Sequence, residues 1–590
     1  MENVTWKLYD KEYKLSEILT EAARACVESR STQPKSFLTN YFQGITTLGK
    51  PKVLVCSRCF TSEGLLGFEI RARLHTNTES CTHAWPLVFP STPAAPEHEE
   101  LGPGTAPPED AGAPEEAASG ALAKQQLNTM DVYVQEHLLP QLLSIGVVEQ
   151  ARWDSTLRGG PVLPCVTFAL SFVAAQAAAS NASRPLYEHL RGLYLEARLK
   201  AISEGVVELE TGGKSLNALP ADVGVASPLR GARRVTLSED RYTLPRLLLP
   251  FFGQSDDAAK TGVALHTLYL IPACLRAEGR GVVGEAVWEK LYAAYQVCCQ
   301  RCHHRTRADG AYVLEGLENL TDAVELAREM LAAAGLTVGV DVSLGLRVGA
   351  AGRYVQAEAP AAHTGKGKKA AVTVVVEPAS PVWLYTLFYG EPDVTSAQLA
   401  TYLQQQVLAC EGAVVYLEDT HELGDAEGHH RLLNALKDRC VLSCRGPLAA
   451  PEQVESGLTE SAAAGLHTNW ALPASQLHTI SWLFAMYYRW TTAADHSVGL
   501  VFSAMEGCSA ADTLDLAVAV GAGFVEVGGL TRTSGAAAVA RFLRLQADLT
   551  ALHRLTDLPA LTQYAPAQTF EGFTDDVPEI KRKVEKKKKK

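Results

Sequence analysis

The sequence predicts an α/β protein of more than one domain, in which an α+β region is followed by an α/β barrel. The chain has 590 residues, and single hydrophobic cores stop growing near roughly 250–300 residues. Residues 53–90 alternate in short β-like runs. From Tyr242 to Leu552, short apolar runs alternate with helical stretches, a pattern typical of a parallel sheet with crossover helices. Six or more such units favour a barrel over an open sheet.

The first 48 residues predict a short helical hairpin. Apolar side chains from Leu15 to Val27 follow a helical spacing, and Pro34 opens a second short helix that carries Phe37 and Leu38. Two short amphipathic helices cannot bury their apolar faces alone. We therefore expect the hairpin to bind a second copy or an amphipathic helix of a partner. The alternative is a hairpin that packs on the rest of its own chain.

Composition divides the remaining chain into three parts. Residues 51–215 form the α+β domain, in which helical periodicity dominates after the β-like runs; its insertion at 92–120 is rich in Pro, Ala, Gly and Glu and has too little apolar surface to fold. Residues 222–556 form the barrel. Residues 557–590 form a tail that ends in a polylysine run. That run is either a solvated end or a grip for an acidic protein surface.

Charge and cysteine usage narrow the class of protein. The net charge is −12, and because the last ten residues carry +7, the rest of the chain carries about −19. An acidic body argues against nucleic-acid binding. Thirteen scattered cysteines fit a reducing compartment, and no secretory signal is visible, so we expect a cytoplasmic protein. The stretch Val162–Ser180 is apolar but contains Pro and Gln, which favours a buried helix over a membrane span.

Several segments, in order, resemble the enolase family. They run from "VLVCSR" and "GFEIRARL" through the Ala-rich "FALSFVAAQAAASNASRPLYEHL" to "VVYLEDTHELGD" and "DTLDLAVAVGAGFVEVGGLTR". The resemblance covers Val53 to Leu552, about 85% of the chain, and is strongest to the divergent enolase-like proteins of sperm flagella. The N-terminal hairpin resembles the dimerisation-docking helices of protein kinase A regulatory subunits and Dpy-30 proteins. The resemblance implies a homodimer with a two-layer N-terminal domain and a barrel that binds Mg²⁺.

The resemblance implies a metal site that this chain keeps only in part. Enolases use carboxylates at the ends of barrel strands to hold Mg²⁺, which prefers hard oxygen ligands. Asp341 and Glu418 match the first two of these carboxylates, whereas Cys444, followed by Arg445, stands at the third. A thiolate is a poor ligand for Mg²⁺. Asp341 and Glu418 are therefore either a residual metal site or hydrogen-bonded barrel residues.

The residues that would perform the family's reaction are mostly replaced. The catalytic Lys position falls at Thr468, and the sequence contains no Lys between Lys437 and Lys581. The general-acid position falls at Asp309 and the position of its partner at Thr267. The position of the family's second Lys falls at Glu526, and Ser503 and Arg532 stand at two substrate-binding positions. Ser503 is followed by Ala-Met-Glu, which cannot grip a phosphate as Arg does.

Two other motifs carry little weight. Cys299-Gln-Arg-Cys302-His303 spells a c-type haem attachment motif, but that attachment needs an exported or organellar context. The same cysteines and histidines are a weak candidate for zinc, which needs four converging ligands. "ETGGKS" at Glu210–Ser215 lacks the first Gly of a P-loop.

Together these patterns favour a catalytically degenerate enolase-type scaffold over an enzyme. We expect it in the cytoplasm, as part of a cytoskeletal or flagellar assembly, with no nucleic acid and no membrane bound. The alternative function is phosphopyruvate hydratase activity, the conversion of 2-phosphoglycerate to phosphoenolpyruvate, at a weak or altered level.

Overall fold

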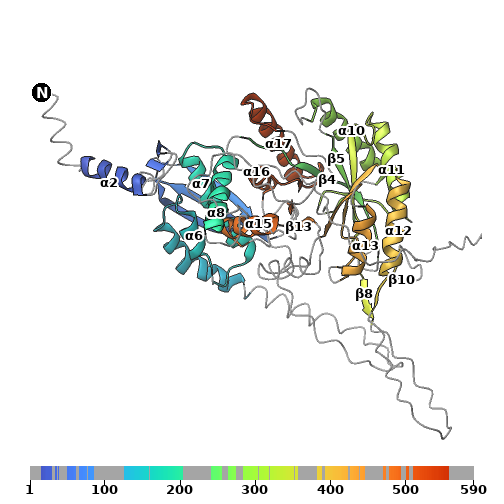
Figure 1. Ribbon diagram of the computed structural model, residues 1–590, viewed down its shortest axis with the longest axis horizontal. Helices are drawn as coiled ribbons and strands as arrows, with labels where there is room; N and C mark the ends of the chain where they lie inside the picture. Colours follow the sequence, from blue (N-terminus) through green and yellow to red (C-terminus); the bar gives the residue numbers. More distant parts are fainter. Residues whose placement is uncertain are drawn as a thin grey trace, which may run out of the picture. The chain divides into compact units, whose positions relative to one another are not determined.

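The chain divides into two compact units, which are described separately. The first unit comprises Met1–Ala197, Leu477–Ala485 and Glu506–Cys508, and the second unit the rest. The computed structural model (Figure 1) describes residues 15–28, 34–35, 37–38, 49–60, 66–75, 78–84, 125, 127–158, 160–203, 241–254, 263–273, 283–302, 305–307, 309–317, 319–350, 352–355, 382–387, 393–422, 425–436, 439–444, 469–473, 478–492, 500–503 and 509–556. The predicted insertion at 92–120 and the tail at 557–590 lie outside these residues.

The N-terminal helix is present as α2 (Leu15–Glu28), which confirms the first of the two predicted helices; the hairpin stays a prediction. Ala22 is fully buried, whereas Leu19 and Val27 are 48% and 76% exposed. The second half of the hairpin lies largely outside the described residues.

A three-stranded meander and a set of helices build the first unit. Strands β1 (Pro51–Phe60), β2 (Leu66–Leu74) and β3 (Glu79–Ala84) pair antiparallel in that order. They are followed by η2 (Val134–Leu138), α5 (Leu139–Leu143), α6 (Gln150–Thr156), α7 (Pro164–Asn181) and α8 (Leu186–Ser203). The turn of η2 is wide, because the Leu139 amide bonds the Val134 carbonyl and Pro140 has no amide hydrogen.

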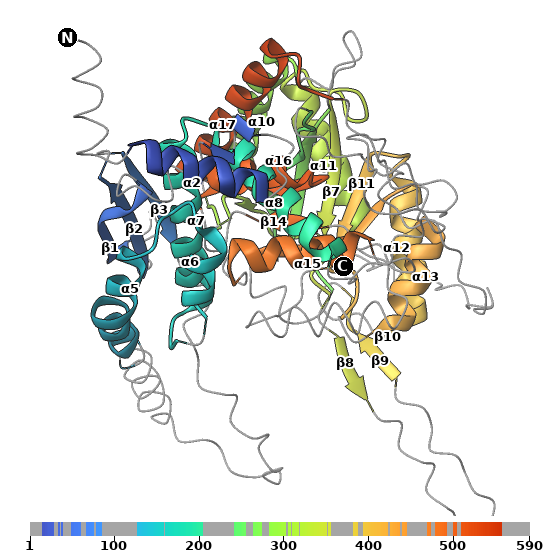
Figure 2. The same ribbon diagram turned by 60° about the vertical axis from the view of Figure 1, so that its left-hand side comes forward.

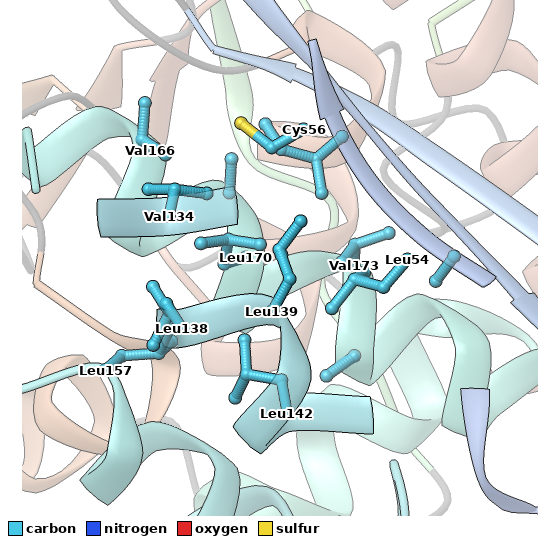
Figure 3. Close-up of a cluster of buried hydrophobic side chains, with 14 of the residues drawn as sticks. Leu54, Cys56, Val134, Leu138, Leu139, Leu142, Leu157, Val166, Leu170 and Val173 are labelled. Atoms are coloured by element: carbon cyan, nitrogen blue, oxygen red, sulfur yellow. The ribbon is translucent and has the colours of Figure 1, made fainter. Parts of the chain in front are cut away.

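The core of the first unit lies between the meander and α7. Leu54 and Cys56 of β1 meet Leu139, Leu170 and other apolar side chains from the helices (Figure 3). Most residues of α7 are buried, which confirms the prediction of a buried helix over Val162–Ser180. Among the described residues no single helix is long and apolar enough to cross a membrane, although α7 and Leu186–Ala197 meet that test as a pair bent by 113°.

The second unit is built on a barrel-like sheet, called the barrel below. Its strands are β4 (Arg246–Gly253), β5 (Thr267–Pro272), β7 (Val342–Arg347), β11 (Val414–Glu418), β12 (Val441–Cys444), β13 (Asn469–Pro473), β14 (Leu500–Ser503) and β15 (Phe524–Glu526). Each strand pairs with the next one named, and β15 pairs with β4, so the pairings return to the starting strand. The predicted barrel is therefore confirmed as a sheet that closes on itself.

The helices of the second unit follow its strands along the chain. They are α10 (Glu285–Arg301), α11 (Leu320–Ala333), α12 (Ser396–Ala409), α13 (Ala426–Leu436), α16 (Ala510–Val520) and α17 (Thr533–Ala551), whereas α15 (Ile480–Thr492) begins in the first unit and ends in the second. In both views α11, α12 and α13 run along the outside of the strands (Figures 1 and 2). Side chains fix the starts of two helices: Asn319 caps α11, and Thr395 and Gln398 form a capping box on α12. The left-handed backbone of Gly521, at a φ of 69°, ends α16.

One strand contradicts the prediction of a parallel sheet. β5 runs antiparallel to both β4 and β7. Beside these paired strands, the Gln254 amide donates to the Leu265 carbonyl and the Leu265 amide donates to the Gln254 side chain. The direction of β5 matters for the site, since its first residue lies at the end of the barrel where the parallel strands finish.

Two further strand sets were not predicted. β6 (Tyr312–Val313) pairs in parallel with the end of β4. β8 (Gly352–Val355), β9 (Val382–Tyr385) and β10 (Val394–Thr395) form a separate antiparallel sheet beside the barrel (Figure 2).

Candidate functional site at the C-terminal end of the barrel

Three predicted site residues close barrel strands, as expected. Glu418, Ser503 and Glu526 are the last residues of β11, β14 and β15, and all three are buried. Because these strands are parallel, their carboxyl ends meet at one end of the barrel, called the mouth below. Thr267 begins the antiparallel β5 and pairs with Arg347, so it lies at the same end.

The mouth rests on an aromatic barrel interior. Tyr269, Tyr416 and Phe524 belong to one buried cluster with Leu248, Ile271, Val441 and Val501. The Tyr269 and Tyr416 rings meet edge to face at 6.3 Å between centroids. The Tyr269 and Tyr416 hydroxyls donate hydrogen bonds to Glu526 and Glu418 at the mouth. This interior is packed with side chains and leaves the acids as the top layer.

Glu418 is held by two protein groups. The Tyr416 hydroxyl donates to Oε2 of Glu418 at 2.6 Å, and Arg347 Nε lies 3.4 Å from Oε1. Arg347 is also the register partner of Glu418 across β7 and β11, and it bonds Asp419 at 2.8 Å. Burial, and then the Glu418 charge, raise the pKa of Tyr416 well above its usual range. The phenol is therefore a fixed donor to this carboxylate.

Glu526 is satisfied in the same manner. The Tyr269 hydroxyl donates to Oε1 at 2.9 Å and the Ser503 hydroxyl donates to Oε2 at 2.9 Å. A carboxylate thus stands at the position where the resemblance implies a Lys, and the neighbouring hydroxyls suit an acceptor. Glu526 and Ser503 are brought together by the structure, as neighbouring strand ends.

Asp309 lies at the mouth in a basic pocket. Its Oδ1 accepts the Ala311 amide at 2.8 Å, and its Oδ2 lies 3.3 Å from the Thr267 hydroxyl and 3.6 Å from Arg307. The pKa of Asp309 is raised mainly by burial, and the nearby Glu526 charge raises it further, whereas Arg307 acts in the opposite sense. Asp309 and Thr267, which the resemblance pairs, therefore contact each other in the structure.

Two arginine side chains donate hydrogen bonds inside this pocket. Arg307 Nη2 lies 2.7 Å from Nε2 of the His266 ring, and its Nη1 donates to the His266 carbonyl. Arg532 donates to the Arg307 carbonyl at 2.9 Å. Arg532 packs against Gly310, where an added Cβ would lie 3.0 Å from its Cγ. Arg532 therefore supports the loop that carries Asp309.

The placement of Asp341 was predicted wrongly. Asp341 precedes β7, and the neighbouring Val342 pairs with Pro272 at the end of the barrel opposite Thr267. The whole of β7 separates it from the level of Glu418, about 20 Å at the rise of an extended strand. Its carboxylate accepts the Thr337 amide at 2.8 Å. The apolar run continues past Asp341, and the structure uses the later part of it as the strand.

Cys444 closes β12 as predicted, but on the wrong face. Val441 belongs to the interior cluster, so strand alternation places Ser443 on the interior side and Cys444 on the other. Ser443 is the register partner of Glu418, and its side chain acts on the Tyr416 hydroxyl. The interior residue at this strand end is thus a serine.

The position assigned to the lost Lys, Thr468, lies outside the described residues. The residue at the mouth end of β13 is Pro473, which pairs with Ser503. Neither Thr468 nor Pro473 supplies an amine.

These residues do not fit a Mg²⁺ ion. Glu418 already contacts a phenol and a guanidinium, Asp341 belongs to the other end of the barrel, and Cys444 faces away from the interior. Mg²⁺ needs several converging hard oxygens. Among the described residues no group of three His, Cys, Asp or Glu side chains could hold a metal ion.

A second buried polar cluster follows β11. Asp425 accepts from the hydroxyls of Tyr385 at 2.6 Å and Ser396 at 2.8 Å. The rings of His421 and His429 lie beside it, 5.5 Å apart between centroids. Burial, and then the neighbouring His429, lower the pKa of His421 to about 3, and burial also lowers the pKa of His429.

Sequence reasoning missed Tyr269, Tyr416, Arg347 and Arg307. A signal existed for Tyr416, because it lies two residues before Glu418 and strand residues two apart share a face. Tyr269 and Arg347 depend on strand pairings that the sequence does not reveal, whereas Arg307 lies only two residues before Asp309. Neither a scan against protein-family models nor a search of curated proteins finds a match to this chain. The functional argument therefore depends on the residues themselves.

Proposed function

We propose that this protein is a non-catalytic scaffold of the enolase type, whose barrel mouth has become part of the hydrophobic and hydrogen-bonded core. One observation carries the proposal: the two inward carboxylates at the mouth, Glu418 and Glu526, each accept a hydrogen bond from a buried tyrosine of the barrel interior. Both oxygens of Glu526 accept hydrogen bonds, whereas Glu418 accepts one on Oε2 and has an ion pair with Arg347 at Oε1. Carboxylates with these partners are poorly placed to bind a metal or move a proton.

Charge at the mouth supports the same proposal. Removing a proton beside a carboxylate creates a dianionic intermediate, which needs metal and cationic groups aimed at it. Among the described residues, Arg347 and Arg307 lie beside the acids of the mouth, and they pair with Asp419 and Asp309. The sequence has no Lys from Asp438 to Ile580 that could act as the base.

An assay of the purified protein with 2-phosphoglycerate and Mg²⁺ tests this proposal. We expect no turnover above about a hundredth of the usual enzyme scale of 1–10³ s⁻¹. Any signal should be equal in the wild type, in Glu418→Gln at the mouth and in Glu427→Gln on the exposed side of α13. Turnover that Glu418→Gln abolishes and Glu427→Gln retains would overturn the scaffold proposal and favour the alternative, a weak phosphopyruvate hydratase. In that alternative Asp309, with its raised pKa, would be the general acid.

The scaffold needs binding surfaces, and we place them at the two ends of the chain. The exposed Leu19 and Val27 of α2 offer apolar contacts to an amphipathic helix or a second copy, and the polylysine run offers charge to an acidic surface such as a tubulin tail. On the resemblance to flagellar proteins, we place the assembly in the cytoplasm, at a cytoskeletal or flagellar structure.

Deletion of residues 1–48 should abolish partner co-purification while the barrel stays folded by circular dichroism. A sharper pair of variants is Leu19→Glu, which removes an exposed apolar contact, and Thr20→Glu, which adds the same charge beside it. Partners should be lost from Leu19→Glu and retained by Thr20→Glu. Partners that survive the deletion would show that the hairpin is not the docking site.

A further inference from the structure

Two cysteines at the end of α10 lie within reach of each other. Cys298 belongs to the last turn of the helix, and Cys302 is its C-cap residue, whose amide bonds the Cys298 carbonyl at 2.9 Å. Residues four apart on a helix share a face. Their sulfur atoms accordingly lie 3.8 Å apart.

The two thiols are not equivalent. The hydrogen bond between the sulfurs, and then burial, raise the pKa of Cys298, whereas the same hydrogen bond lowers the pKa of Cys302. Both residues are buried, at 0% and 4% exposure. Cys302 is thus the thiol of the pair that loses its proton more readily. Two neighbouring thiols, one of which ionises more readily, are the arrangement of a redox pair.

A covalent bond requires movement at the end of the helix. A disulfide needs about 2.05 Å between sulfurs, so the sulfurs must approach by about 1.8 Å from their present separation. It also needs roughly 3.5–4.5 Å between Cβ atoms, whereas residues four apart on a helix have Cβ atoms about 5–6 Å apart. Cys302 lies at the cap, where helix ends fray, so its backbone can move without breaking the helix interior.

We propose that Cys298 and Cys302 form a redox-active dithiol, which a peroxide oxidises to an intramolecular disulfide. Cys302 loses its proton, and its thiolate attacks one peroxide oxygen and becomes a sulfenic acid; the hydroxide that leaves takes up that proton and departs as water. The Cys298 sulfur then attacks the Cys302 sulfur, water leaves, and the disulfide forms. In total two thiols and one hydrogen peroxide give one disulfide and two waters. A small dithiol reverses the reaction by exchange.

The position of the pair gives the oxidation a target. Cys302 accepts the Arg305 amide at 3.2 Å, and from there the chain leads to Arg307 and Asp309 at the mouth. The neighbouring Cys299 side chain acts on the hydroxyl of Tyr312 in β6, the strand that follows this loop. Oxidation therefore changes the C-terminal end of α10, where the loop that carries Asp309 begins. The inference does not depend on the proposed scaffold function.

Trypsin separates the two cysteines, which makes the bond directly visible. Cleavage after Lys290, Arg301 and Arg305 places Cys298 in peptide 291–301 and Cys302 in peptide 302–305. The full-length protein is treated with hydrogen peroxide, remaining thiols are blocked with N-ethylmaleimide, and the digest is analysed by mass spectrometry. We expect the two peptides to be joined, with the loss of two hydrogens, and to separate after dithiothreitol.

Matched variants decide which sulfurs react. The cross-link should persist in Cys299→Ser and disappear in Cys298→Ser and Cys302→Ser, and alkylation of Cys302 should slow several-fold in Cys298→Ser. Circular dichroism checks that each variant is folded. A cross-link that survives in Cys298→Ser would assign the partner to Cys299 and overturn the proposal. So would recovery of both peptides as maleimide adducts at a peroxide dose that oxidises the exposed Cys81.

Discussion

Acid should destabilise the barrel unit through the buried His421. The folded state keeps this ring neutral down to about pH 3, whereas an unfolded histidine takes up a proton near 6.5. The unfolded state thus binds more protons between these values, so stability is complete above 6.5 and decreases as the pH falls. The slope is about 1.4 kcal/mol per pH unit, which amounts to about 2 kcal/mol between pH 6.5 and pH 5. His429, whose pKa is also lowered, adds to this loss.

Urea unfolding at several pH values between 7.5 and 5 measures this effect. Asp309 has a raised pKa and contributes with the opposite sign, so the informative quantity is the difference between the wild type and His421→Gln. Glutamine cannot take up a proton, and the free energy of unfolding of this variant should therefore vary less with pH. Curves for the two proteins that stay parallel from pH 7.5 to pH 5 would refute a neutral, buried His421.

Three further substitutions test the packing described above. Tyr269→Phe keeps the ring and removes one donor to a buried carboxylate, which should cost about 2 kcal/mol in urea unfolding; a loss below roughly 0.5 kcal/mol would contradict the hydrogen bond. Gly428→Ala places a Cβ 2.2 Å from the buried ring of His421 and should cost about 1–3 kcal/mol, whereas Gly192→Ala, with open space around it, should be neutral or stabilising in the same assay. Asp154→Ala leaves three donors without their acceptor in the first unit and should cost about 2–3 kcal/mol, seen as faster amide exchange in α6 and α7; unchanged exchange would contradict that role.

Strand ends were predictable where an apolar run stops at a polar residue. Glu418, Ser503 and Glu526 each close such a run, and each closes a strand. Asp341 interrupts a longer apolar run, and the local sequence does not show which half of that run forms the strand. The prediction that Cys444 faces the barrel interior was wrong for a related reason, because a shift of one residue along a strand moves a side chain to the opposite face.

The partners of the mouth residues could not be predicted from the sequence. Tyr269 and Glu526 are 257 residues apart, and they meet only because β5 runs antiparallel. The direction of β5 appears in its pairing with β4 and β7, which local residue propensities do not predict. Enolase-type ancestry and the identity of partners stay predictions, because they rest on motifs rather than on geometry.

The first unit completes its core with a segment that the chain supplies very late. Asp154 of α6 accepts the Ser481 amide at 2.9 Å, and Ser171 of α7 accepts the Ile480 amide at 2.9 Å, across 309 residues. At a synthesis rate of roughly 5–20 residues per second, the ribosome needs about 15–60 s to make that stretch. Throughout this interval Asp154 and Ser171 bond each other and Gln150 but lack the two amides of the late segment. The nascent N-terminal unit therefore stays open to chaperones until the late barrel strands emerge, and a message cut short before Ile480 yields a first unit that cannot close.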